Sequence, residues 1–120
     1  MRRLLLARIA HARSGDKADR ADIGLFAYDA PSYAVIKREV TAERVAAHFA
    51  WLADGPVERY PLDNILALKF VLNCALQGGA ARSLRSDNLG KTIGAALLRM
   101  EIDVDPAEAA GLPRLRTQAE

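Results

Sequence analysis

The chain has 120 residues, of which 51% are hydrophobic, and its 17 Lys and Arg residues against 15 Asp and Glu residues give a formal net charge of +2. This length and composition predict one globular domain that buries about two-thirds of the surface of the unfolded chain. Basic residues are interspersed with acidic ones, which argues against a nucleic-acid-binding protein, since such proteins gather positive charge on one face.

The sequence predicts a soluble, cytoplasmic protein. The N-terminal apolar stretch ends at Arg8, too early for the hydrophobic region of a signal peptide, and no later run reaches the about 18 apolar residues of a membrane span. The single cysteine, Cys74, lies in an apolar segment and can form no internal disulfide, which suits a reducing compartment. We expect it to be a small buried side chain rather than a catalytic thiol.

Two strands and a short helix are predicted first in chain order. Residues 4–13 and 23–28 contain apolar runs typical of strands, and the polar stretch between them, 11–24 (HARSGDKADRADIG), is expected to be a loop. The Asp-Ala-Pro sequence at 29–31 favours the start of a helix, because Pro is tolerated in the first helical turn. A short helix is therefore predicted over 32–40.

The clearest predicted helix begins after Thr41. Thr41 is a suitable N-cap, and the negative charge of Glu43 in the first turn complements the helix dipole. One apolar stripe follows, made of Val45, Phe49 and Leu52. The Asp-Gly-Pro sequence at 54–56 is expected to end this helix.

A hairpin is predicted next, with strands at 57–60 and 65–72 and a turn at 61–64. Polar residues recur every four positions in and after the second strand, a spacing that suits a buried helix equally; they are Lys69, Asn73 and Gln77. Residues 65–77 could therefore be strand or helix. Turn residues on both sides of the apolar run favour the strand.

The C-terminal third of the chain predicts one helix and one strand. Ser86 or Asp87 is expected to cap a helix whose apolar face consists of Leu89, Ile93, Leu97 and Met100. Gly90 and Gly94 lie four residues apart, which lets another backbone approach closely, either from the sheet or from a second subunit. Apolar and acidic residues alternate over 100–104, as in a half-exposed strand.

The order of these elements predicts the fold. Strand, strand, helices, hairpin, helix and strand contain a β-α-β-β-α-β core with one extra strand near the N-terminus. We therefore predict an α+β ferredoxin-like plait, an antiparallel sheet with helices on one face, over residues 1–105. Residues 106–120 lack a sustained pattern and are predicted to be a C-terminal tail, mobile or bound to a partner. The second face of the sheet would be open to water, which favours a homodimer or a hetero-complex.

The first candidate site is the Ser-Gly-Asp-Lys sequence at 14–17. Gly15 permits a tight turn that could expose backbone N–H groups and direct Asp16 and Lys17 outward. Lys17 could then hold an anion or act as a positioned acid. A solvated loop, with a turn formed by the Asp16 side chain, would explain the same residues, and both readings stay open here.

The second candidate site is a glycine-containing connection before the last helix. Gly78 and Gly79 with Arg82 and Arg85, followed by a helix N-terminus, could receive an anion such as a carboxylate or the phosphates of coenzyme A. An ordinary connection capped by Asp87 is the alternative. No metal or cofactor is expected, because the histidines and aspartates lack the spacing of zinc or calcium sites and the phosphate-binding loop motif does not occur.

Several short motifs occur together and in order along about residues 11–104: Ser14-Gly15-Asp16-Lys17, Asp22-Ile23-Gly24, Leu68-Lys69-Phe70-Val71-Leu72, Gly78-Gly79, Ser83-Leu84-Arg85, Asp87 and Gly90-Lys91. This combination resembles the small ferredoxin-like domain at the C-terminus of acyclic terpene utilisation (AtuA-like) proteins, which also occurs as a separate short polypeptide. The family pattern usually reads Ser-Gly-Asp-Lys-Gly, Asn-Ile-Gly and Leu-Asn-Phe. Ala18, Asp22 and Lys69 depart from it, and the last two change the hydrogen-bonding and charge of their positions.

The resemblance implies catabolism of branched or terpenoid acyl compounds, as coenzyme A thioesters, beside a larger polypeptide. We expect an accessory subunit, oligomeric in its own right, that contributes the Gly-Asp-Lys loop to a shared site. Lys17 would neutralise an anionic group of the substrate, and Asp16 would orient that group or transfer a proton. The expected substrate-binding residues are Ser14, Gly15, Asp22, Gly78, Gly79, Arg82 and Arg85. A self-sufficient hydratase or lyase with its site between identical subunits, or a purely structural dimerisation module, is the alternative.

Overall fold

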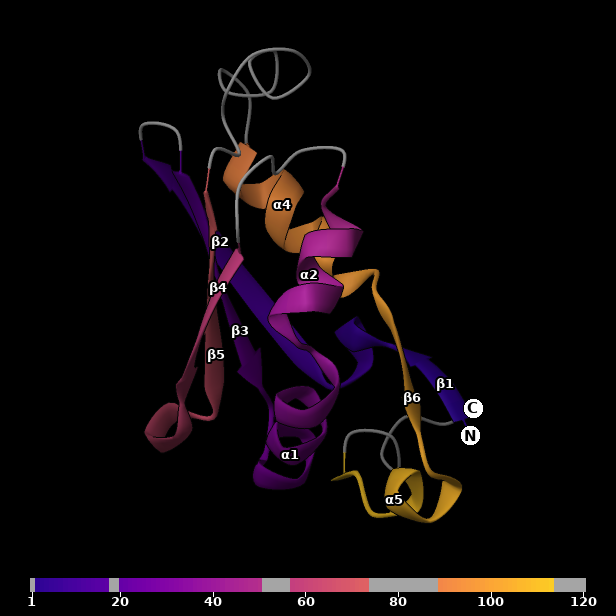
Figure 1. Cartoon of the computed structure of the whole chain (residues 1–120). Helices are drawn as coiled ribbons and strands as arrows, with labels where there is room; N and C mark the ends of the chain where they lie inside the picture. Colours follow the sequence, from indigo (N-terminus) through magenta and orange to yellow (C-terminus); the bar gives the residue numbers. More distant parts are fainter. Residues whose placement is uncertain (1, 18–19, 51–56, 74–88, 114–120) are drawn as a thin grey trace.

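The computed structural model describes residues 2–17, 20–50, 57–73 and 89–113 (Figure 1). Its main sheet has four strands in the order β2-β3-β5-β4, and each strand is antiparallel to its neighbours. These strands are β2 (Ala10–Lys17), β3 (Arg20–Ala27), β4 (Val57–Leu62) and β5 (Ala67–Asn73). Because β3 and β4 lie on either side of β5, they are parallel to each other, and helices connect them as in a split β-α-β unit.

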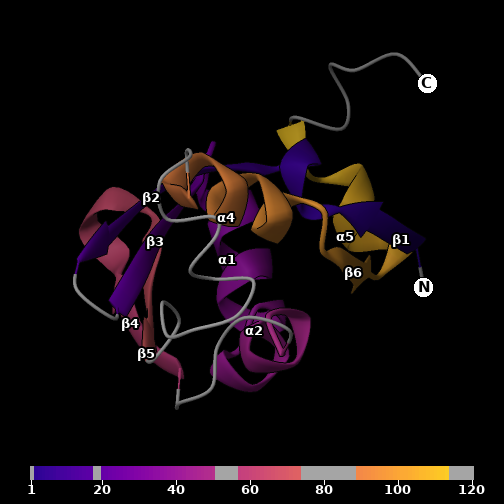
Figure 2. The same cartoon turned by 90° about the horizontal axis from the view of Figure 1, so that it is seen from above.

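Three helices cover one face of this sheet (Figures 1 and 2). They are α1 (Ala30–Glu39), α2 (Ala42–His48) and α4 (Leu89–Leu98). The Asp29 carboxylate caps α1 by accepting a 2.8 Å hydrogen bond from the Ser32 N–H, and the Thr41 hydroxyl caps α2 through the Arg44 N–H at 3.1 Å. Both helices therefore begin where their local sequence specifies a cap.

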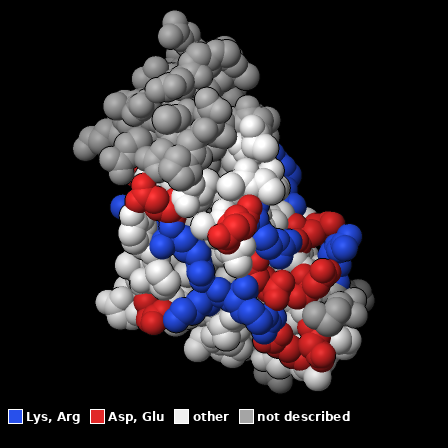
Figure 3. Space-filling view, viewed as in Figure 1, with Lys and Arg blue, Asp and Glu red and all other residues white. Residues whose placement is uncertain are grey.

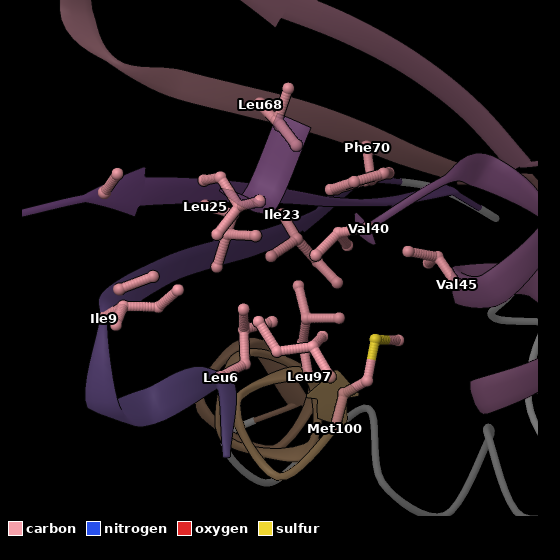
Figure 4. Close-up of a cluster of buried hydrophobic side chains, with 14 of the residues drawn as sticks. Leu6, Ile9, Ile23, Leu25, Val40, Val45, Leu68, Phe70, Leu97 and Met100 are labelled. Carbon is pink, nitrogen blue, oxygen red and sulfur yellow. The ribbon is translucent and has the colours of Figure 1, made fainter. Parts of the chain in front are cut away.

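The core lies between the sheet and these helices (Figure 4). Every second residue of the two central strands is fully buried there, namely Ile23, Leu25, Leu68, Phe70 and Leu72. The helices and the segments after them contribute Ile36, Val40, Val45, Phe49, Ile93, Leu97 and Met100. This period of two along the strands leaves the intervening residues on the opposite face of the sheet.

A separate two-stranded ribbon joins the two ends of the domain. It consists of β1 (Arg2–Leu5) and β6 (Glu101–Val104), paired antiparallel from Arg2 opposite Val104 to Leu5 opposite Glu101. Leu4 and Ile102 face the core, whereas Arg3 lies outside and pairs with Asp103 at 3.4 Å. The 3-10 turn η1 (Leu6–Arg8) connects β1 to β2 and is held by a 2.8 Å bond from the Leu6 N–H to the Met100 carbonyl.

The topology confirms the predicted ferredoxin-like α+β class and refines its strand order. In the plait, the last strand of the β-α-β-β-α-β core pairs with the first. Here β2 occupies that place beside β3, and β6 pairs with β1 instead. The β2–β3 hairpin needs only a two-residue connection, so its pairing is local, whereas β6 would have to return from the far end of the chain.

Three sequence predictions differ from the structure in their bounds. The predicted strand at 4–13 is two strands separated by η1, because Leu6 and Ile9 are both buried and the chain turns between them. The predicted loop at 11–24 is instead most of β2 and β3. The strand favoured over a helix at 65–72 is confirmed as β5, which begins two residues later and ends one residue later than expected. Residues 74–77, the cysteine at 74, the expected helix end at 54–56 and the expected cap at 86–87 lie outside the described residues.

The segment after β6 also differs from the tail that we expected. Residues 106–110 form a short helix, α5 (Pro106–Ala110), whose N-cap is Asp105. Ala109 and Leu112 are buried in the core cluster, and Arg38 of α1 binds Glu108 through two hydrogen bonds of 2.8 and 2.9 Å. The apolar contact of Ala109 and Leu112 explains why this part of the chain folds against the domain.

Positive and negative groups are intermixed on the face of the molecule that Figure 3 shows. The ion pairs include Arg38–Glu108 at 2.8 Å, Arg44–Glu39 at 3.5 Å and Lys37–Asp63 at 3.0 Å. No described helix combines the length and the apolar character that would let it cross a membrane.

Candidate functional site

The second face of the four-stranded sheet carries none of the described helices (Figures 1 and 2), and we call it the open face. Cross-strand partners project to the same side of a sheet, so the register sorts this face into rows, three of which contain described side chains. The apolar row consists of His11, Phe26, Ala67 and Leu62. The basic row consists of Arg13, Gly24, Lys69 and Tyr60. The acidic row consists of Gly15, Asp22, Val71 and Glu58.

A hollow of about 320 Å³ lies on this face, and Gly24 is at its centre. Arg13 and Lys69 are the cross-strand partners of Gly24 on its two sides, separated by two strand spacings, or about 10 Å. Gly24 places no side chain between them. The hollow is lined by Arg13, Ser14, Asp22, Gly24, Phe26, Leu62, Ala67, Leu68 and Lys69.

The Phe26 ring forms the aromatic part of the hollow and leans toward Gly24. A Cβ atom at position 24 would lie only 2.8 Å from Cε2 of Phe26, so the ring can take this position because residue 24 is a glycine. Phe26 stacks on His11 with a centroid distance of 5.3 Å and an interplanar angle of 17°, and His11 is 5.2 Å from the Tyr28 ring. The three rings therefore form a continuous series, of which Phe26 lines the hollow.

The charged side chains around the hollow have no protein partners among the described residues. Arg13, Lys69 and Asp22 all lie on this face, and no hydrogen bond or ion pair joins their side chains to any residue that the structure describes. Glu58, in contrast, accepts a hydrogen bond from the Tyr60 hydroxyl. Two cations and one carboxylate give the hollow a net positive charge, which suits an anionic group attached to an apolar body.

Asp22 and Ser14 are the predicted site residues that line this hollow. Asp22 carries an exposed carboxylate on the open face, two positions along β3 from Gly24. Ser14 has a structural contact instead, because its hydroxyl accepts a 3.1 Å hydrogen bond from the Gly94 N–H of α4 on the helix-covered side of the sheet. The roles in substrate binding that we predicted for both stay predictions.

The segment Gly15-Asp16-Lys17 is the last part of β2 rather than a loop. Gly15 pairs with Asp22, Asp16 with Ala21 and Lys17 with Arg20, so backbone pairing with β3 replaces the expected turn at Gly15. Adjacent positions of a strand belong to opposite faces of the sheet, so positions 16 and 17 do not share one face. The side chains at 15–17 lie outside the described part of the structure, as do Gly78, Gly79, Arg82 and Arg85.

Sequence reasoning missed Arg13, Phe26, Leu62 and Lys69. Arg13 and Phe26 could have been found from the alternation of residue types within 10–27. Small or apolar residues occupy one face of the two strands there, and the residues between them lie on the other face. The small or apolar residues are Ala10, Ala12, Ala21, Ile23 and Leu25. Such a period of two indicates paired strands even where many residues are polar. Reading 11–24 as a hairpin would have placed Arg13 beside Gly24.

A second group of titratable side chains connects α1 to the turn η2 (Asp63–Ile65) between β4 and β5. The Tyr33 hydroxyl donates a 2.5 Å hydrogen bond to Asp63, and the Lys37 ammonium donates a second at 3.0 Å. Burial, with a smaller effect of the Asp63 carboxylate, raises the pKa of Tyr33 to about 12. The hydrogen bond from Tyr33, followed by that from Lys37, lowers the pKa of Asp63. This group joins two elements and lies outside the hollow.

Metal ligation has little support in the described residues, since no three His, Cys, Asp or Glu side chains among them are placed to share an ion. The comparison with protein families gives one finding, in which the model of the AtuA ferredoxin-like domain matches residues 4–103. The comparisons with curated proteins and with solved structures give no match. The matched range extends from β1 into β6 and includes the whole open face.

Proposed function

Because the chain belongs to the AtuA ferredoxin-like domain family, we propose that it is an accessory subunit of a larger AtuA-like polypeptide in the catabolism of acyclic terpenes or branched acyl-CoA compounds. The match covers nearly all of the folded chain, which is the size of a single domain. A domain of this kind fits a subunit that works beside the remaining parts of such a protein. The proposal assigns no reaction to the chain alone.

The open face of the sheet is the observation that carries this proposal. It has large side chains with substantial exposure, namely Tyr28 at 43%, Tyr60 at 46% and Leu62 at 37%. Of these, Leu62 also lines the hollow. Several large, exposed side chains on one face are typical of a surface that another protein covers. The larger polypeptide would contact this face.

Such a contact would also complete a shared site. The hollow is open in the isolated chain, and a partner that covers it would exclude water from Arg13 and Lys69. Electrostatic attraction to an anion is stronger where water is excluded, so both cations would hold a substrate more firmly in the complex. The Gly15-Asp16-Lys17 end of β2 belongs to the same hairpin, and we propose that it borders this shared site.

Co-purification tests the proposal with one variant on the open face and one matched control. The chain is co-expressed with a tagged AtuA-like polypeptide that lacks this domain. Leu62→Glu introduces a charge on the open face, whereas Leu5→Glu introduces the same charge at a residue of similar exposure, 44%, on the β1–β6 ribbon. Burying a leucine contributes about 1.5–3 kcal/mol, so Leu62→Glu should weaken the complex at least tenfold.

The control variant Leu5→Glu should bind as the native chain does. Absence of a complex with the native chain, or equal loss in both variants, would overturn the proposal. Two further results would favour the alternatives instead. A homodimer of the native chain that only Leu62→Glu dissociates would indicate a dimerisation module. Turnover of an enoyl thioester by the chain alone, abolished by Lys17→Ala, would indicate a self-sufficient enzyme.

A further inference from the structure

We propose that the hollow on the open face is a binding site for an organic monocarboxylate with a short apolar chain. The carboxylate would lie between Arg13 and Lys69, and the apolar chain would lie over Phe26 toward Leu62. This inference concerns the isolated chain and does not require the larger polypeptide.

The basic row provides the position for the carboxylate. Arg13 and Lys69 stand on the strands at either side of Gly24, about 10 Å apart at the backbone, and the Phe26 ring leans into the space that residue 24 leaves between them. Neither cation is engaged by a hydrogen bond or an ion pair within the described chain. A guanidinium can bind both oxygens of a carboxylate at once, and an ammonium on the other side adds a second charge-assisted contact.

The neighbouring rows give the ligand a direction. The basic row lies between the apolar row and the acidic row. Each of these is two positions along the strands, or about 7 Å, from the basic row. Phe26 and Leu62 offer apolar contact to the chain of the ligand. Asp22 and Glu58 on the opposite side would repel a second negative charge. A monoanion with one apolar end therefore fits better than a phosphate or a dicarboxylate.

The size of the hollow limits the apolar part. Its volume of about 320 Å³ is at the lower end of the range of about 300–1,000 Å³ found for ligand pockets. A branched chain of a few carbon atoms fits within it. In the isolated chain one side of such a ligand stays in water, so we expect a dissociation constant in the millimolar range, within reach of spectroscopic titration.

An NMR titration of the isolated, isotope-labelled chain tests this inference. The probes are 3-methylbutanoate, the uncharged 3-methylbutan-1-ol of the same shape, and inorganic phosphate. We expect saturable shifts of the backbone amides of Arg13, Gly24, Phe26 and Lys69 with the carboxylate. The alcohol and phosphate should bind at least tenfold more weakly, since each lacks one of the two parts that the hollow recognises.

Two variants separate a specific site from general charge attraction. Arg13→Gln with Lys69→Gln should weaken carboxylate binding at least tenfold, whereas Arg99→Gln, which removes an exposed cation just after α4, should leave it unchanged. The inference is overturned if the carboxylate gives no saturable shifts, if alcohol or phosphate binds equally well, or if Arg99→Gln has the same effect as the double variant. Because no partner is present, this outcome is independent of the co-purification result.

Discussion

The hydroxyl of Ser14 on β2 accepts a 3.1 Å hydrogen bond from the backbone N–H of Gly94 in α4. The helix can approach the strand this closely because Gly94 has no side chain. A Cβ atom there would lie 3.0 Å from the Ser14 Oγ and 3.7 Å from the Ala12 Cβ. Small residues on both elements therefore set the distance between α4 and the sheet.

Substituting these two residues should give non-additive changes in stability. Ser14→Ala removes one acceptor and should lower the free energy of unfolding by about 1 kcal/mol. Gly94→Ala adds a Cβ that meets the Ser14 Oγ at 3.0 Å in the native chain, but meets only the Cβ atoms of residues 12 and 14, at ordinary distances, in the Ser14→Ala background. Alanine also favours a helix by about 1 kcal/mol over glycine. Chemical denaturation should therefore show that the effect of Gly94→Ala on the free energy of unfolding is at least about 1 kcal/mol more favourable in the Ser14→Ala background than in the native chain. Additive effects of the two substitutions would contradict this packing.

Gly24→Ala should displace the Phe26 ring while the domain stays folded. Replacing glycine in a strand gains about 0.5–1 kcal/mol, and losing the stack on His11 costs about 0.5–1.5 kcal/mol, so the net change in unfolding free energy should stay within about 1 kcal/mol. The His11 ring protons should move in the NMR spectrum as the ring current of Phe26 is withdrawn. Gly111→Ala, whose Cβ would meet its nearest atom at 3.5 Å, is the control and should leave those protons unmoved. Unchanged His11 signals in Gly24→Ala would argue against the stack.

The Tyr33 hydroxyl should lose its proton at a higher pH than an ordinary tyrosine. Burial and the bond to Asp63 raise its pKa to about 12, so the folded state holds this proton more tightly than the unfolded chain, where a tyrosine pKa is about 10. The resulting contribution to stability is complete below about pH 10 and is lost as the pH rises toward about 12. Absorbance at 295 nm should show a late component that Tyr33→Phe removes and Tyr28→Phe retains. Persistence of that component in Tyr33→Phe would contradict the assignment.

Leu112→Ala should destabilise the domain although it follows the last strand. Leu112 is buried in the core cluster, and truncation of a buried leucine costs about 2–5 kcal/mol. Thermal or chemical unfolding measures this loss. Leu5→Ala, at an exposed leucine, should change the unfolding free energy by less than about 0.5 kcal/mol. Equal, small effects would mean that residues beyond 105 behave as the tail that the sequence predicted.

The elements that could be predicted from the sequence are those specified by neighbouring residues. Asp29 and Pro31 mark the start of α1, and Thr41 marks the start of α2, because a cap acts on N–H groups within the next three residues. The strands at 57–60 and 65–72 were found in the same way, since turn residues flank them. The ferredoxin-like class followed from the order of such elements.

The hairpin of β2 and β3 was harder to predict from the sequence because the buried side of β2 consists of small residues. Ala10, Ala12 and Ser14 pack against α4 and η1 without a strong hydrophobic signal, and their polar neighbours suggest a loop. The pairing of β6 with β1 depends on contacts across almost the whole chain, which no local pattern reports.

The candidate site shows the same division between local and distant information. Asp22 belongs to a recognisable short motif and was predicted, whereas Arg13 and Lys69 became neighbours of Gly24 only through strand register. Neither cation stands out in the sequence, where basic residues are frequent. Register depends on the whole sheet, so this part of the site needed the structure.

The β1–β6 ribbon bears on how the chain is made. β1 leaves the ribosome first, but its partner strand, Glu101–Val104, is among the last parts of the domain to be translated. The strands of the main sheet all lie within residues 10–73 and can pair while synthesis continues. Leu4, in contrast, has no cross-strand partner until Ile102 has been synthesised. Closure of the ribbon therefore comes after the main sheet can pair, and a nascent chain stalled before residue 101 would present β1 as an unpaired strand to the cell's chaperones.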